Sequence, residues 1–213
     1  MTGEISMSNI SKEPNETQDA VITFDFSELS KLKAIATKER PYAGRVSAGL
    51  AIRLLTQAKH DTPYVLDAID ALEGLLPGSN TKAAGPFRHP PLQPLWHQHF
   101  FAPRHMLRNI GIRWGMDNGG NRELGFMIRD VADRFGNDID LWQGIIADRF
   151  VNGYVERSQG GRLTGDWIVF GEHDGNRYYI DLATHEEGTS ANASILLSKL
   201  RGSAEAEFPF LFT

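Results

Sequence analysis

The chain has 213 residues, of which 41% are apolar and 23% are charged, and its formal net charge is −5. These values are typical of a soluble globular protein, and the acidic balance argues against a protein that coats nucleic acid over its whole surface. Cysteine is absent, which excludes disulfides, thiolate catalysis and zinc sites built on sulfur.

The first element in chain order is a polar stretch over residues 1–20, which is acidic and poor in large apolar side chains. Such a composition predicts a flexible tail. The first thirty residues carry six acids against one lysine, and no apolar run reaches the length of a membrane span. We therefore expect a cytoplasmic protein without membrane contact, in which residues 21–213 form a single domain.

The next part, residues 27–153, is predicted to be mainly helical after a short strand in "VITFDF". Apolar side chains recur at helical spacing in several segments. Residues 77–94 are rich in proline, which excludes helix and favours an extended connector. Gly153 is expected to end the last helix. The predicted helices cover residues 27–38, 42–58 and 63–75, the segment "NRELGFMIRDVADRFGND" up to a stop at Gly136, and residues 138–153.

The C-terminal part, residues 163–213, changes to the alternation of a β-sheet. Residues 166–183 predict a hairpin, because Asp174-Gly175 is a dipeptide that favours a two-residue turn. A two-residue turn fixes the register of the whole hairpin, and it predicts that Phe170 faces Tyr179 and that Trp167 faces Leu182. The terminal "FPFLF" is expected to be an edge strand. Helices followed by strands predict an α+β fold with an N-terminal helical layer and a C-terminal antiparallel sheet.

Histidines are concentrated in one cationic stretch of this acidic chain. Four of the seven lie between residues 89 and 105, and no Asp or Glu occurs from residue 74 to residue 116. Two interpretations follow. On a strand, His97 and His99 would point the same way, as a pair of metal ligands does, although no carboxylate lies nearby. On a helix that begins after Pro94, cations and aromatic rings would gather on one face and meet a phosphate or an unstacked base.

The second interpretation assigns roles to the residues of this stretch. Arginine beside histidine lowers the imidazole pKa, so that a neutral His97 or His99 is available as a general base near pH 7. The positive charges would bind the anion and the aromatic rings would stack on a base. The expected substrate-binding residues in this stretch are Arg104, Arg108, Trp96 and Phe101.

A second group of candidate residues lies in "YYIDLATH", the end of the hairpin and its continuation. Tyr179, Asp181 and His185 are expected to project from one face of the strand. A carboxylate that orients an imidazole is a usual part of an acid–base site. If the fold brings this face against the histidine stretch, two remote imidazoles exchange protons, Tyr179 positions the substrate, and Asp181 contacts it.

From these residues we hypothesise a metal-independent hydrolase or nuclease that acts on RNA or a nucleotide in a cationic cleft, with no cofactor. One alternative is a non-enzymatic protein-binding or regulatory module of the toxin, phage or defence-system type, in which the aromatic residues and "FPFLF" contact a partner. A second alternative is a hydrolase whose metal ion is bound by histidine. The usual phosphate-loop, dinucleotide, nucleophile-elbow and zinc-helix motifs are missing from the sequence.

Overall fold

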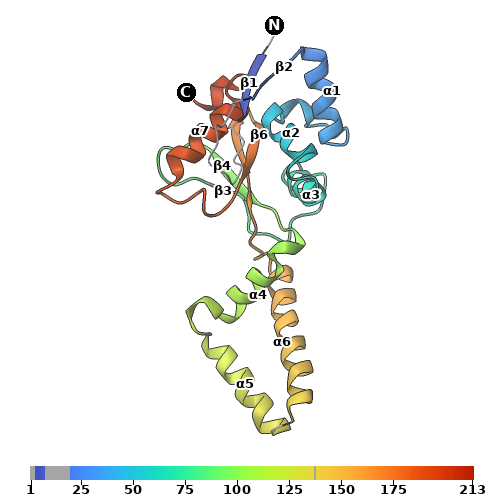
Figure 1. Ribbon diagram of the computed structural model, residues 1–213, viewed down its shortest axis with the longest axis vertical. Helices are drawn as coiled ribbons and strands as arrows, with labels where there is room; N and C mark the ends of the chain where they lie inside the picture. Colours follow the sequence, from blue (N-terminus) through green and yellow to red (C-terminus); the bar gives the residue numbers. More distant parts are fainter. Residues whose placement is uncertain (1–2, 8–19, 137) are drawn as a thin grey trace.

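The computed structural model describes residues 3–7, 20–136 and 138–213. It confirms the α+β class, because a mostly helical N-terminal part precedes a four-stranded antiparallel sheet in the C-terminal half. Figure 1 shows two parts: a body, in which helices flank the sheet, and an arm of three helices that extends away from it. Within the described ranges, no helix is long and apolar enough to cross a membrane.

The sheet has the strand order β3-β4-β5-β6, and all its neighbours are antiparallel. The proline-rich connector supplies the first strand, and the predicted hairpin supplies the last two. The expected extended connector is therefore present, with one short strand inside it. The strands are β3 (Gly85–Pro86), β4 (Trp96–His99), β5 (Trp167–His173) and β6 (Asn176–Ala183).

The predicted register of the hairpin is confirmed near the turn and wrong beyond it. Phe170 faces Tyr179, as expected, but an irregularity between Val169 and Phe170 shifts the rest of the pairing by one residue. Trp167 consequently faces Ala183 and not Leu182. A bulge of this kind adds one unpaired residue to one strand and exchanges the faces of all that follow. The exchange decides which side chains of β6 lie near the histidines.

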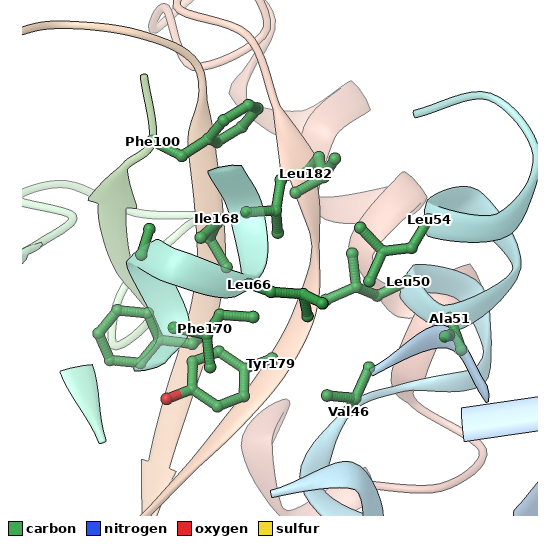
Figure 2. Packing of buried hydrophobic residues seen from close by; sticks show 14 of the residues in the cluster. Val46, Leu50, Ala51, Leu54, Leu66, Phe100, Ile168, Phe170, Tyr179 and Leu182 are labelled. Carbon is green, nitrogen blue, oxygen red and sulfur yellow. The ribbon is translucent and has the colours of Figure 1, made fainter. Parts of the chain in front are cut away.

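One face of the sheet packs against α1 (Phe26–Ala36), α2 (Ala48–Leu55) and α3 (Thr62–Leu72). Figure 2 shows the apolar side chains of this layer meeting those of β5 and β6. The residues that it labels are buried and form one cluster with a few neighbours: Val46, Leu50, Ala51, Leu54, Leu66, Phe100, Ile168, Phe170, Tyr179 and Leu182.

The three predicted N-terminal helices exist, but their ends differ from the expectation. The first is capped by Asp25, which accepts a bond from the backbone N–H of Glu28 while the Glu28 carboxylate accepts one from the Asp25 N–H. The second begins only at Ala48, and the hydroxyl of Ser47 caps it by accepting a hydrogen bond from the backbone N–H of Leu50. These caps satisfy N–H groups that a helix leaves without partners.

The other face of the sheet packs against α7 (Ala193–Ala204) and the C-terminal residues. The expected edge strand in "FPFLF" is wrong, because Pro209–Leu211 form a 3₁₀ turn. Phe208 and Leu211 are buried in the second apolar cluster of the body. The apolar segment "FPFLF" therefore predicts a strand from the sequence but folds as a short turn that packs on the sheet.

A buried carboxylate, Asp181, joins β6 to α2 and α7. Its side chain is fully buried and accepts hydrogen bonds from Arg53 Nε at 2.6 Å and Ser203 Oγ at 2.6 Å. The two helices cross closely at this point, because a Cβ on Gly49 would lie 2.6 Å from the Cβ of Ser203. Asp181 is thus a structural tie between three elements.

The arm consists of α4 (Met106–Trp114), α5 (Arg122–Phe135) and α6 (Ile139–Gln159). The two predicted helices are confirmed over residues 122–135 and from residue 139 onward. The expected end at Gly153 is wrong, since α6 continues to Gln159. Gly153 lies where α6 crosses α4, and a Cβ there would lie 2.6 Å from Trp114 Nε1. This glycine serves close helix packing and not termination.

At the N-terminus, β1 (Gly3–Met7) pairs with β2 (Ala20–Phe24) as a separate two-stranded sheet. The strand expected in "VITFDF" is present. The flexible tail expected over residues 1–20 overlaps β1 and otherwise lies largely outside the described residues.

Candidate functional site

His97 and His99 lie on strand β4, in the middle of the sheet. A helix that begins after Pro94 was the wrong expectation, because residues 96–99 pair with β5 and α4 starts only at Met106. Alternate residues of a strand point to the same face, so the two imidazoles lie on one side of the sheet. Their ring centroids are 5.8 Å apart.

Trp167 lies at the centre of this face. It is the direct cross-strand partner of His99, and its indole lies 4.6 Å from the His97 ring and 6.0 Å from the His99 ring, centroid to centroid. Phe87, from the connector before β4, closes the other side of His97 at 4.9 Å. The sequence places Trp167 only in the register of the hairpin and does not mark it as a candidate site residue.

His185 joins the group from the loop after β6. Trp167 pairs with Ala183, so these two side chains lie on the same face of the sheet. His185 follows Ala183 by two residues and therefore points to that face as well. Its ring lies 4.8 Å from the indole and 5.1 Å from the His99 ring. The two remote segments therefore do meet. We refer to His97, His99, Trp167 and His185 as the histidine cluster.

Burial sets the protonation state of the histidine cluster. It lowers the pKa of His97 to about 4, and the positive charges of His185 and Lys82 act in the same direction. Burial also lowers the pKa of His99 to about 4, against a hydrogen bond to the Gly165 carbonyl that favours the charged form. Burial and the charge of Arg108 lower the pKa of His185, whereas Asp166 opposes them. At pH 7 these shifts favour neutral imidazoles.

Several polar atoms of the histidine cluster have no hydrogen-bond partner among the described residues. They are His97 Nδ1, Trp167 Nε1 and His185 Nε2. His99 Nδ1 lies 3.1 Å from the Gly165 carbonyl oxygen. A carbonyl only accepts, so His99 carries its proton on Nδ1, and Nε2 is left as an acceptor. Buried polar groups normally have partners, so these unpartnered atoms set the histidine cluster apart from ordinary core packing.

The arginines expected to bind an anion have different surroundings. Arg104 contacts Asp61 at 2.6 Å and Asp166 at 2.7 Å, so two carboxylates already balance its charge. Arg108, on the first turns of α4, is exposed and makes no ion pair with any described residue. The charge of Arg108 is therefore less compensated than that of Arg104, and it acts on His185 together with the charge of Lys82.

Tyr179 and Asp181 are not part of the histidine cluster. Tyr179 is fully buried in the opposite layer, where its hydroxyl donates to Glu73 at 2.6 Å. Asp181 is the structural tie to Arg53 and Ser203. The face that we expected Tyr179, Asp181 and His185 to share is interrupted by the bulge, which places Tyr179 on the side opposite Asp181 and His185.

The two aromatic candidates also face elsewhere. Trp96 is half-buried and stacks on Phe170 at 6.3 Å, against the apolar layer of α2 and α3. Phe101 is half-buried and packs on Tyr154 of α6 at 5.5 Å. Neither ring therefore belongs to the histidine cluster.

Two glycines that the sequence reading did not single out hold the cluster together. A Cβ on Gly165 would overlap the Phe100 carbonyl oxygen, and this glycine supplies the carbonyl that orients His99. A Cβ on Gly188 would overlap the six-membered ring of Trp167. No motif marks either position, because each reflects a contact between distant segments.

The metal-ligand interpretation finds no matching geometry. In the part of the chain that the structure describes, no three His, Cys, Asp or Glu side chains are arranged so that they could bind one metal ion. Comparison of the chain with known protein families, curated proteins and solved structures found no match. The candidate function therefore depends on the residues of the histidine cluster themselves.

Proposed function

We propose that this protein is a metal-independent hydrolase that cleaves RNA, with the 2′-hydroxyl as nucleophile and the histidine cluster as the proton-transfer site. The observation that supports the proposal is the approach of His99 and His185, which lie 86 residues apart in the sequence, to a centroid distance of 5.1 Å. Two imidazoles that face one phosphate can remove a proton on one side and return one on the other.

His99 is assigned the role of general base. Its Nδ1 proton is directed to Gly165, so Nε2 presents a lone pair. In the first step Nε2 takes the proton of the 2′-hydroxyl, the 2′-oxygen forms a bond to phosphorus, and the bond from phosphorus to the 5′-oxygen breaks. The product is a 2′,3′-cyclic phosphate, which water then opens to a 3′-phosphate.

His185 is assigned the role of general acid. It must be protonated when the substrate is bound, and Asp166 already favours its charged form. An incoming phosphate adds a negative charge beside the ring, which raises the pKa of His185 further. His185 then gives its proton to the departing 5′-oxygen. Lys82 and Arg108 stabilise the charge on the phosphate.

The alternative in which the aromatic residues serve as contacts for a protein partner has less support. Phe208 and Leu211 are buried in the second apolar cluster, and four other aromatic residues of this alternative are half-buried: Trp96, Phe101, Phe210 and Phe212. Anchors of a protein interface must be accessible in the free protein. The cluster of imidazoles is the feature that core packing alone does not explain.

The proposal is tested by incubating the purified full-length chain with single-stranded RNA of mixed sequence in the presence of EDTA. We expect cleavage that leaves 2′,3′-cyclic phosphate ends, detected by mass spectrometry. The matched control is DNA of the same sequence, which lacks the 2′-hydroxyl and should stay intact. Absence of RNA cleavage, or equal cleavage of DNA, would contradict the proposal.

A further inference from the structure

The arm formed by α4, α5 and α6 has a very small apolar core for its size. In Figure 1 it extends away from the body, with the turn between α5 and α6 at its free end. Its buried hydrophobic side chains among the described residues are Trp114, Met127 and Val131, and six partly buried ones pack against them: Ile110, Leu124, Trp142, Ile145, Ile146 and Phe150. A helix is mainly stabilised by packing one face against a partner, and most of the apolar contacts inside the arm are made by side chains that stay partly exposed.

The arm also exposes much of the large apolar surface of the chain. Ten of the sixteen large hydrophobic side chains that are exposed among the described residues lie between residues 106 and 155. On α6, Leu141, Val151 and Val155 are 49%, 47% and 38% exposed and fall within one stripe at 100° per residue. Gly144 lies in the same stripe, and a Cβ there would have no neighbour within 4 Å. Nothing in the described chain covers this face.

Charge is segregated along the arm. Residues 106–129 carry four arginines and two acids, whereas residues 130–148, which include the free end, carry five aspartates and one arginine. Arg122 and Asp133, which are eleven residues apart on the same side of α5, are both exposed and make no ion pair within the described residues. The arm therefore has a basic half near the body and an acidic half at its end.

From these observations we propose that the arm is a homodimer interface, in which the arms of two copies of this chain lie antiparallel. A two-fold axis makes the same patch serve both copies. It places the acidic end of one arm against the basic half of the other, and it covers the exposed stripe of each. A partner of uniform charge would match only one half of the arm.

The test uses the full chain in analytical ultracentrifugation. At tens of micromolar we expect a species of twice the 23.7 kDa chain mass. Val151→Glu should convert it to monomer with unchanged circular dichroism. Ile195→Glu, which changes a 70% exposed residue on α7 outside the arm, should leave the dimer intact.

Charge reversal tests the antiparallel arrangement without depending on the apolar stripe. Arg122→Asp and Asp133→Arg should each weaken self-association at least tenfold, because each brings like charges together across the axis. An equimolar mixture of the two should restore dimers, since every contact is then between opposite charges. A wild-type monomer at these concentrations, or a dimer that all three arm variants leave unchanged, would overturn the proposal.

Discussion

Replacement of His185 with alanine is expected to lower RNA cleavage by about 10²- to 10⁴-fold, the range that positioned acid–base groups usually contribute. The substitution removes the proposed proton donor to the 5′-oxygen. It breaks no hydrogen bond through Nε2, because that atom has no partner among the described residues. The melting temperature should therefore change little. The measurement is the initial rate of cleavage of a fluorescent RNA at saturating substrate.

The control for this variant is His173→Ala on the same hairpin. His173 is 41% exposed and stacks on Phe210, away from the histidine cluster, so its loss should leave the rate within about twofold. Added imidazole should restore part of the activity of His185→Ala, which a purely structural residue would not allow. If His185→Ala cleaves RNA at the wild-type rate, the proposed role of the cluster is wrong.

The second large effect concerns stability. Asp181→Ala should lower the free energy of unfolding by about 3–5 kcal/mol, the usual cost of leaving a buried ion without its partner. The change removes the acceptor for Arg53 and Ser203, and also for the backbone N–H of Leu182 at 2.7 Å. Urea unfolding followed by fluorescence gives the difference in the free energy of unfolding. The value for Asp181→Asn should lie between those of the wild type and Asp181→Ala, because asparagine keeps one acceptor.

The matched control is Glu172→Gln on the neighbouring strand. Glu172 is 44% exposed and contacts Arg177 at 3.4 Å, and an ion pair of this kind contributes at most about 1 kcal/mol. A loss below about 1 kcal/mol in Asp181→Ala would show that the three-way contact is not a structural tie.

The sequence predicted the parts of the fold that depend on local pattern. Helical spacing located α3 and α5 within a few residues, and the Asp174-Gly175 turn located the hairpin and its first pairs. The bulge next to Val169 was not predictable, because the alternation of apolar residues continues through it. That one-residue shift places Tyr179 on the side opposite His185 and Trp167 on the same side. Asp181 lies after the shift and is instead bound by Arg53 and Ser203.

The candidate site was predictable only in its composition. The concentration of histidines pointed to His97, His99 and His185, and the three do come together. The contacts that shape their surroundings come from distant segments, such as Gly188 against Trp167. Arg104 was a natural anion ligand by its spacing, yet Asp61 and Asp166 balance its charge from two other parts of the chain. Periodicity carries no information about such long-range pairs.

The central claim is that His97, His99 and His185 form one anion-binding, proton-transfer site. The most direct test is an NMR titration of the imidazole nitrogens from pH 3 to pH 8, with and without a nucleoside 3′-monophosphate. Without the nucleotide, His97 and His99 should titrate near pH 4, well below the ordinary value of 6.5. With the nucleotide, the pKa values of all three should rise together. Three imidazoles that titrate near 6.5 and do not respond to the nucleotide would contradict the claim.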